Sequence, residues 1–146
     1  MDLKSSPDIT VFIAGSLGIT SLDDNVKRRI LNIINKGFRI VVGDANGVDA
    51  AVQTFLKENE YDNVIVFYSV KVRNNIGNFT TQKIETTGYH GNWHTAKDVA
   101  MTNECDYGFM IWDGKSHGTN NNIIRLMKQN KKCLVYLNED KSFLQY

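Results

Sequence analysis

The sequence predicts an α/β fold: a three-layer, doubly wound domain on a mainly parallel five-stranded sheet. Short runs of β-branched and apolar residues recur along the chain, and segments with helical apolar spacing separate most of them. Strands that alternate with helices indicate a parallel sheet covered on both faces. Right-handed crossovers then favour the Rossmann-like strand order 3-2-1-4-5.

The first strand is predicted over residues 9–14, where six β-branched or apolar residues end at a Gly15-Ser16 turn. A helix follows, because apolar residues recur on one helical face at i, i+4, i+7 and i+8. These residues are Val26, Ile30, Ile33 and Ile34. Gly37 stands where a helix C-cap is expected.

The same cycle then repeats. A second strand is predicted over residues 38–42, a helix over 48–56 and a third strand over 64–68. Residues 69–92 interrupt the rhythm with a polar, glycine-dotted excursion. Long loops in compact domains are frequently lids or binding segments, so this excursion is expected to cover part of a site.

Regular structure resumes after the excursion. The pattern predicts a helix over residues 93–105, a strand over 107–112, a helix over about 120–129 and a last strand over 133–137. A chain of 146 residues with 42% apolar residues is most simply one domain, spanning residues 1–146.

Composition excludes several classes of function. The 17 basic and 16 acidic residues leave a net charge of +1, unlike the basic footprint of a nucleic-acid-binding domain. No apolar run approaches the roughly 20 residues that span a bilayer, and the first residues lack the apolar stretch of a signal peptide. We therefore expect a cytoplasmic protein without membrane or nucleic-acid partners, in which Cys105 and Cys133 stay reduced.

Three loops of small and polar residues carry the candidate site. They span residues 15–18, 43–47 and 114–119, each after a predicted strand. Ligands of doubly wound domains bind beyond the carboxyl ends of the strands, and free amides at a helix start favour an anion such as phosphate. The predicted ligand-binding residues of these loops, with the adjoining Trp112, are Gly15, Ser16, Gly43, Asp44, Trp112, Gly114, Lys115, Ser116, Gly118 and Thr119.

Several of these residues admit a second interpretation. Asp44 either binds a ribose hydroxyl or caps the following helix, and Trp112 either stacks on a base or closes the core. Asp49 is interpreted as a surface charge that favours the helix dipole. His90 and His94 have a metal-like spacing, but no cysteine or carboxylate cluster completes a site, so no metal or other cofactor is expected.

The motifs around these loops suggest a family. Residues 43–49 read GDANGVD, Lys97-Asp98 precedes Met101, and residues 112–119 follow the pattern W-x-G-x-S-x-G-T. In this order they resemble the SLOG superfamily of Rossmann-like domains, near its YspA/YpsA-like branch. That superfamily also includes the lysine-decarboxylase-like cytokinin-activating enzymes and the DprA core. The resemblance covers most of the chain except residues 69–92, and it implies a pocket for a nucleotide or a nucleotide-derived ligand, with Lys97 and Asn122 among the ligand-binding residues.

Two departures from the family weaken a transfer of its hydrolase activity. Asn122 stands where the phosphoribohydrolases of the family have a glutamate, and an amide cannot act as a base. Lys97-Asp98 stands where those enzymes have an arginine-lysine pair. The leading expectation is therefore ligand binding, as a sensor or sequestering protein.

Two alternatives remain open. One is an N-glycosidase (phosphoribohydrolase) or a deoxyribosyltransferase acting on nucleoside monophosphates. Asp98 and Asp44 would then be its catalytic carboxylates. The other is an oligomeric interaction protein whose loops are only structural, and the sequence leaves a homo-oligomer open.

Overall fold

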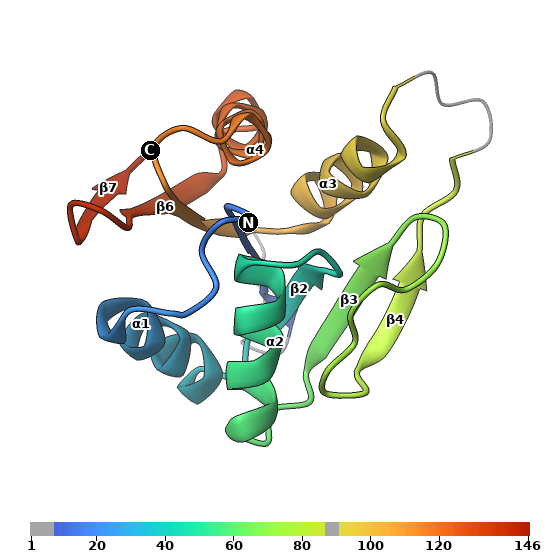
Figure 1. The fold of residues 1–146 in the computed structure, drawn as a ribbon, viewed down its shortest axis with the longest axis horizontal. Coiled ribbons are helices and arrows are strands. Elements are labelled where there is room, and N and C mark those ends of the chain that lie inside the picture. The colour runs from blue at the N-terminus through green and yellow to red at the C-terminus, as the bar shows by residue number, and fades with distance from the viewer. Residues whose placement is uncertain (1–7, 87–90) are drawn as a thin grey trace.

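The computed structural model describes residues 8–86 and 91–146 and has an α/β fold with a mainly parallel, seven-stranded sheet (Figure 1). The strands are β1 (Thr10–Gly15), β2 (Arg39–Gly43), β3 (Val64–Tyr68), β4 (Thr80–Lys83), β5 (Tyr107–Trp112), β6 (Lys132–Leu137) and β7 (Ser142–Gln145). The helices are α1 (Asp24–Asn35), α2 (Val48–Glu58), α3 (Trp93–Glu104) and α4 (His117–Lys128).

The sheet has the order β4-β3-β2-β1-β5-β6-β7. Its five central strands are the predicted ones, all parallel, in the predicted relative order. The predicted count of five is wrong, because β4 adds to one edge in parallel and β7 to the other in antiparallel. Both edge strands are four residues long and largely exposed, so neither carries the apolar run that marks a buried strand.

Helices cover both faces of the sheet, as the predicted three layers require (Figure 1). Along β1, Val11 and Ile13 belong to a core that includes residues of α1 and α2. Phe12 and Ala14 belong to a second core that includes residues of α3 and α4. This alternation is the period of two of a strand buried on both sides.

Two predicted boundaries move. The helix expected from about residue 120 begins at His117, with Ser116 as its N-cap, so Gly118 and Thr119 lie inside its first turn. The excursion at 69–92 is not all loop, because it contains β4. Residues 87–90 of that excursion lie outside the described residues, as does the N-terminal segment 1–7.

None of the helices within residues 8–86 and 91–146 combines the length and the apolar character that crossing a membrane requires.

Candidate functional site

The candidate site lies at the edge of the sheet where the parallel strands end. Gly15 is the partner of Ile111 across β1 and β5, and the Ser16 amide donates to the Ile111 carbonyl at 3.0 Å. The loops after β1 and β5 therefore start side by side, and β2 ends on the other flank of β1. Two groups of side chains gather at this edge. The carboxylate cluster consists of Asp44, Asp49, Arg73, Lys97 and Asp98, and the hydroxyl cluster consists of Ser16, Asp113, Ser116 and Thr119.

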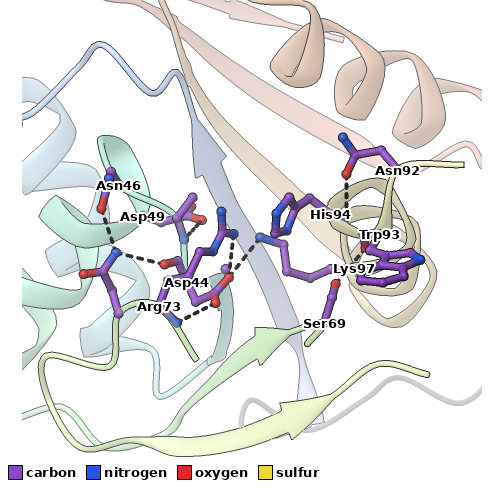
Figure 2. A network of polar contacts seen from close by, with 12 residues as sticks. Asp44, Asn46, Asp49, Ser69, Arg73, Asn92, Trp93, His94 and Lys97 are labelled. Atoms are coloured by element: carbon purple, nitrogen blue, oxygen red, sulfur yellow. Dashed lines mark hydrogen bonds and ion pairs between the residues drawn. The ribbon is translucent and has the colours of Figure 1, made fainter. Parts of the chain in front are cut away.

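Asp44 is the centre of the carboxylate cluster and is almost fully buried, at 1% exposure (Figure 2). The Arg73 guanidinium donates to its Oδ1 at 2.7 Å, and the Arg73 amide donates to its Oδ2 at 2.9 Å. The Lys97 ammonium lies 3.3 Å from the same Oδ1. Burial alone would raise the pKa of Asp44, but the hydrogen bonds from Arg73 and the charge of Lys97 hold it below its usual value. Asp44 is therefore an ionised carboxylate with two cationic partners.

Asp49 is buried, so its interpretation as a surface charge is wrong. Its Oδ2 accepts a hydrogen bond from the Ala45 amide at 3.1 Å. Burial raises the pKa of Asp49 to about 7, with Lys97 opposing the shift and Asp98 adding to it. Asp49 can thus hold or release a proton near neutral pH.

Gly43 explains how two charged side chains reach the end of β2. A Cβ atom at this position would lie 2.4 Å from the Asp49 carboxylate and 2.9 Å from the Lys97 ammonium. Both distances are shorter than van der Waals contact, so only glycine leaves room for this packing.

Asp98 is the half-buried member of the carboxylate cluster. Burial raises its pKa, while Lys97, Arg125 and a hydrogen bond from the Asn122 amide oppose the shift. The Asn122 side chain also accepts from Arg125 at 2.8 Å, so it bridges the arginine and the carboxylate. Asn122 thus orients Asp98 from the neighbouring helix.

The hydroxyl cluster joins the first and last loops of the site. The Ser16 and Ser116 hydroxyl oxygens lie 2.8 Å apart, and Ser16 Oγ also accepts from the Asp113 amide at 3.0 Å. The Ser116 hydroxyl is 3.2 Å from that of Thr119. Residues separated by 100 positions in sequence are therefore linked directly.

The loop after β5 closes on itself. The Asp113 carboxylate accepts from the amides of Lys115 and Ser116, both at 2.8 Å, and these bonds lower the pKa of Asp113. The Trp112 indole donates to the Ser116 carbonyl at 3.0 Å. The Asp113 carboxylate therefore already bonds two amides of the loop that was expected to bind a phosphate.

The first turn of α4 is more open. Among the hydrogen bonds of the described residues, none uses the amide of His117, Gly118 or Thr119. A Cβ atom at Gly118 would meet nothing within 4 Å, and the same holds for Gly114 and Gly18. Three unpaired amides at a helix start are a favourable place for an anion.

The edge thus brings together most of the predicted site residues. Gly15 packs tightly instead, because a Cβ there would lie 2.1 Å from the Ile111 carbonyl oxygen. Lys115 is exposed and contributes its amide to the loop.

Arg73 and the residues that hold its segment in place were not expected from the sequence. Gln53 is fully buried on α2. Its side-chain amide donates to the carbonyls of Gly43 and Asn74. Its side-chain oxygen accepts from the Ile76 amide. The Asn74 side chain donates to the Asp44 carbonyl at 2.9 Å. One signal was available: Asp49, Gln53 and Leu56 share a helical face, so two polar residues align with a core leucine.

Cavities of about 400 and 420 Å³ lie away from both clusters, on the α1 side of the sheet. Within the described residues, no group of three or more histidine, cysteine, aspartate or glutamate side chains is placed to hold a metal. His90, half of the metal-like histidine pair, lies outside them.

No protein-family model matches this chain, and neither a curated protein nor a solved structure matches it. The resemblance to the SLOG superfamily therefore stays a prediction from the motifs.

Proposed function

We propose that this edge of the sheet binds a nucleotide or a nucleotide-derived ligand, with a phosphate on the first turn of α4. The observation that carries the proposal is the set of unused amides of His117, Gly118 and Thr119 beside open space at Gly118. The oriented peptide dipoles of a helix start stabilise a bound anion, and glycine lets it approach the backbone closely.

The sugar of such a ligand has partners one turn further along α4. Asn122 follows Gly118 by four residues, which places the two on one face about one turn apart. The half-buried Asp98 carboxylate suits a ribose hydroxyl, and the buried Asn122 side chain, which bonds Asp98 and Arg125, holds it in position. The SLOG-like motifs support the same ligand class.

Calorimetric titration and thermal unfolding with a panel of nucleoside monophosphates, cyclic dinucleotides and ADP-ribose derivatives test this proposal. Ligand at 100 times its Kd should stabilise the protein by about 2.7 kcal/mol. Gly118→Asp places a carboxylate in the proposed phosphate site and should abolish the effect, whereas Gly118→Ala keeps the amides and should retain most of it. Absence of binding by every ligand, or binding that survives Gly118→Asp, would contradict the proposal.

A second candidate function is cleavage or transfer at the N-glycosidic bond of a nucleoside monophosphate. It is favoured by Asp98, which is half-buried, has a raised pKa and is oriented by Asn122. Such a carboxylate can stabilise an oxocarbenium ion or act as a nucleophile. Asp44 is a weaker candidate, because Arg73 and Lys97 already engage its oxygens. Chromatography after long incubation should reveal free base that Asp98→Asn abolishes; release unaffected by Asp98→Asn rejects this candidate.

A further inference from the structure

The face of the sheet beneath α1 is incompletely covered at its β6–β7 end. On this side α1 and α2 form the helical layer, and β6 continues directly into the antiparallel strand β7 (Figure 1). No crossover helix is therefore inserted between these two strands. Phe143 on β7 is 42% exposed although its ring lies 4.9 Å from that of buried Tyr136, measured between centroids.

Two adjoining hollows occupy this place. One has a volume of about 400 Å³ and the other about 420 Å³, and both are lined by Arg29, Asn32 and Leu134. They form one groove along α1, called here the basic groove. Volumes of roughly 300–1,000 Å³ are typical of small-molecule sites.

Part of the wall of the basic groove is apolar. Phe38, Phe109 and Leu134 line the first hollow, and Phe143 lines the second. Apolar walls of this kind favour an apolar ligand body through removal of its surface from water.

The rim of the basic groove carries charge of one sign. Its basic residues are Arg28, Arg29, Lys36 and Lys132, and none of the described residues that line either hollow is acidic. The whole chain has a net charge of only +1, so the rim is a local concentration of cations. Cations around a concave apolar surface attract an anion.

We propose that the basic groove binds a small amphipathic anion, with an apolar body on the aromatic walls and one anionic head at Arg29 and Lys132. A second copy of the chain fits less well, because a twofold interface would bring the same cationic rim against itself. The groove lies on the α1 side, and the proposed nucleotide site involves α3 and α4, so this proposal does not depend on the proposed function.

Fluorescence titration with 1-anilinonaphthalene-8-sulfonate tests the proposal. Its uncharged analogue N-phenyl-1-naphthylamine has the same apolar body without the sulfonate and is the matched probe. We expect saturable binding of the sulfonate at one site, weaker binding of the neutral analogue, and competition by laurate. Affinity for the sulfonate should fall as ionic strength rises.

Two variants test whether the sulfonate binds in the basic groove. The double variant Arg29→Gln/Lys132→Gln should weaken binding of the sulfonate about fivefold or more, because each exposed charge contributes little alone. Asn32→Asp adds an anion to the lining of both hollows without removing a core side chain and should weaken it as well. Neither variant should change binding of the neutral analogue. The control Lys128→Gln, on exposed α4 surface, should change neither.

Three results would overturn the proposal. The first is equal affinity for the sulfonate in wild type and in the double variant. The second is displacement of the sulfonate by hexaglutamate but not by laurate, which would assign the groove to an acidic protein segment. The third is a dimer in sedimentation that Asn32→Asp dissociates. Circular dichroism of both variants verifies that they are folded, and Asn32→Asp provides the test should the double variant fail to fold.

Discussion

The carboxylate cluster and the hydroxyl cluster lie at the same edge of one sheet but are built differently. The first contains formal charges buried against one another, with Asp44 at 1% and Lys97 at 3% exposure. The second contains hydroxyls and one surface carboxylate, and it adjoins open space at Gly118.

This difference separates two tasks. Buried charges cost desolvation energy and need partners within the protein, so the carboxylate cluster holds together β2, α3 and the segment around Arg73. The unpaired amides beside the hydroxyl cluster remain available to a ligand. We therefore expect substitutions in the first to act mainly on stability, and a substitution that adds negative charge at Gly118 to act mainly on binding.

The largest effect is expected from Asp44→Asn. It removes the ionised carboxylate that contacts the buried Lys97 ammonium, which destabilises by about 3 kcal/mol. Urea unfolding measures this change. Asp62→Asn, at an exposed position, is the control and should change stability by less than about 0.5 kcal/mol. A loss as small as that of the control would mean that the pair is not buried in solution.

Two glycine substitutions sharpen the comparison between the clusters. Gly43→Ala forces a methyl group against Asp49 and Lys97 and should destabilise the fold by roughly 2 kcal/mol. Gly118→Ala meets open space in a helix and should stabilise it by about 0.5 kcal/mol. Thermal unfolding of both variants measures the two changes in stability. Equal effects at the two sites would mean that the two clusters do not differ in packing.

The pH dependence of stability tests the state of Asp49. Its folded-state pKa of about 7 lies above its ordinary value of 3.8, so over this interval the folded state binds more protons than the unfolded state. The free energy of unfolding should therefore fall as pH rises from about 4 to about 7. Asp49→Asn removes this contribution, so wild type should lose more stability than the variant across the interval. Parallel curves would show that Asp49 ionises normally.

The smallest stability loss is expected from Ser16→Ala. It removes the acceptor of the Asp113 amide and the partner of the Ser116 hydroxyl, at a cost of about 1 kcal/mol. Urea unfolding against Thr20→Ala, an exposed hydroxyl on the same loop, isolates the effect. A loss comparable with that of Asp44→Asn would mean that the hydroxyl cluster carries as much stability as the buried charges.

The five central strands could be predicted from the sequence because a strand buried on both faces is a short run of β-branched and apolar residues. Parallel strands also bring their following loops to one edge, which is why Ser16 and Ser116 could be expected together despite their separation. Asp44 was expected at this edge by the same rule, whereas Lys97 was expected there only from the family resemblance, and the structure shows an ion pair between them.

Other features depend on contacts that local patterns do not reveal. β4 has the sequence TTQK, and its pairing follows from its docking beside β3 rather than from apolar periodicity. Arg73 lies in a polar segment without a repeat. Its position depends on the next residue, Asn74, which accepts a hydrogen bond from Gln53 and donates one to the Asp44 carbonyl. The interpretation of Asp49 as a surface charge failed because its partners come from distant elements.

The partners of Asp44 also bear on the order in which the chain folds. Arg73 and Lys97 follow it by 29 and 53 residues, so both contacts close long segments of the chain. The conformational entropy of these segments is lost before the contacts contribute any stabilising free energy. The β1–α1–β2 unit can form before Arg73 and Lys97 contact Asp44. Until they do, the Asp44 carboxylate remains hydrated. Completion of the site becomes a late event, which makes the burial of Asp44 a marker that distinguishes the finished fold from a partly assembled sheet.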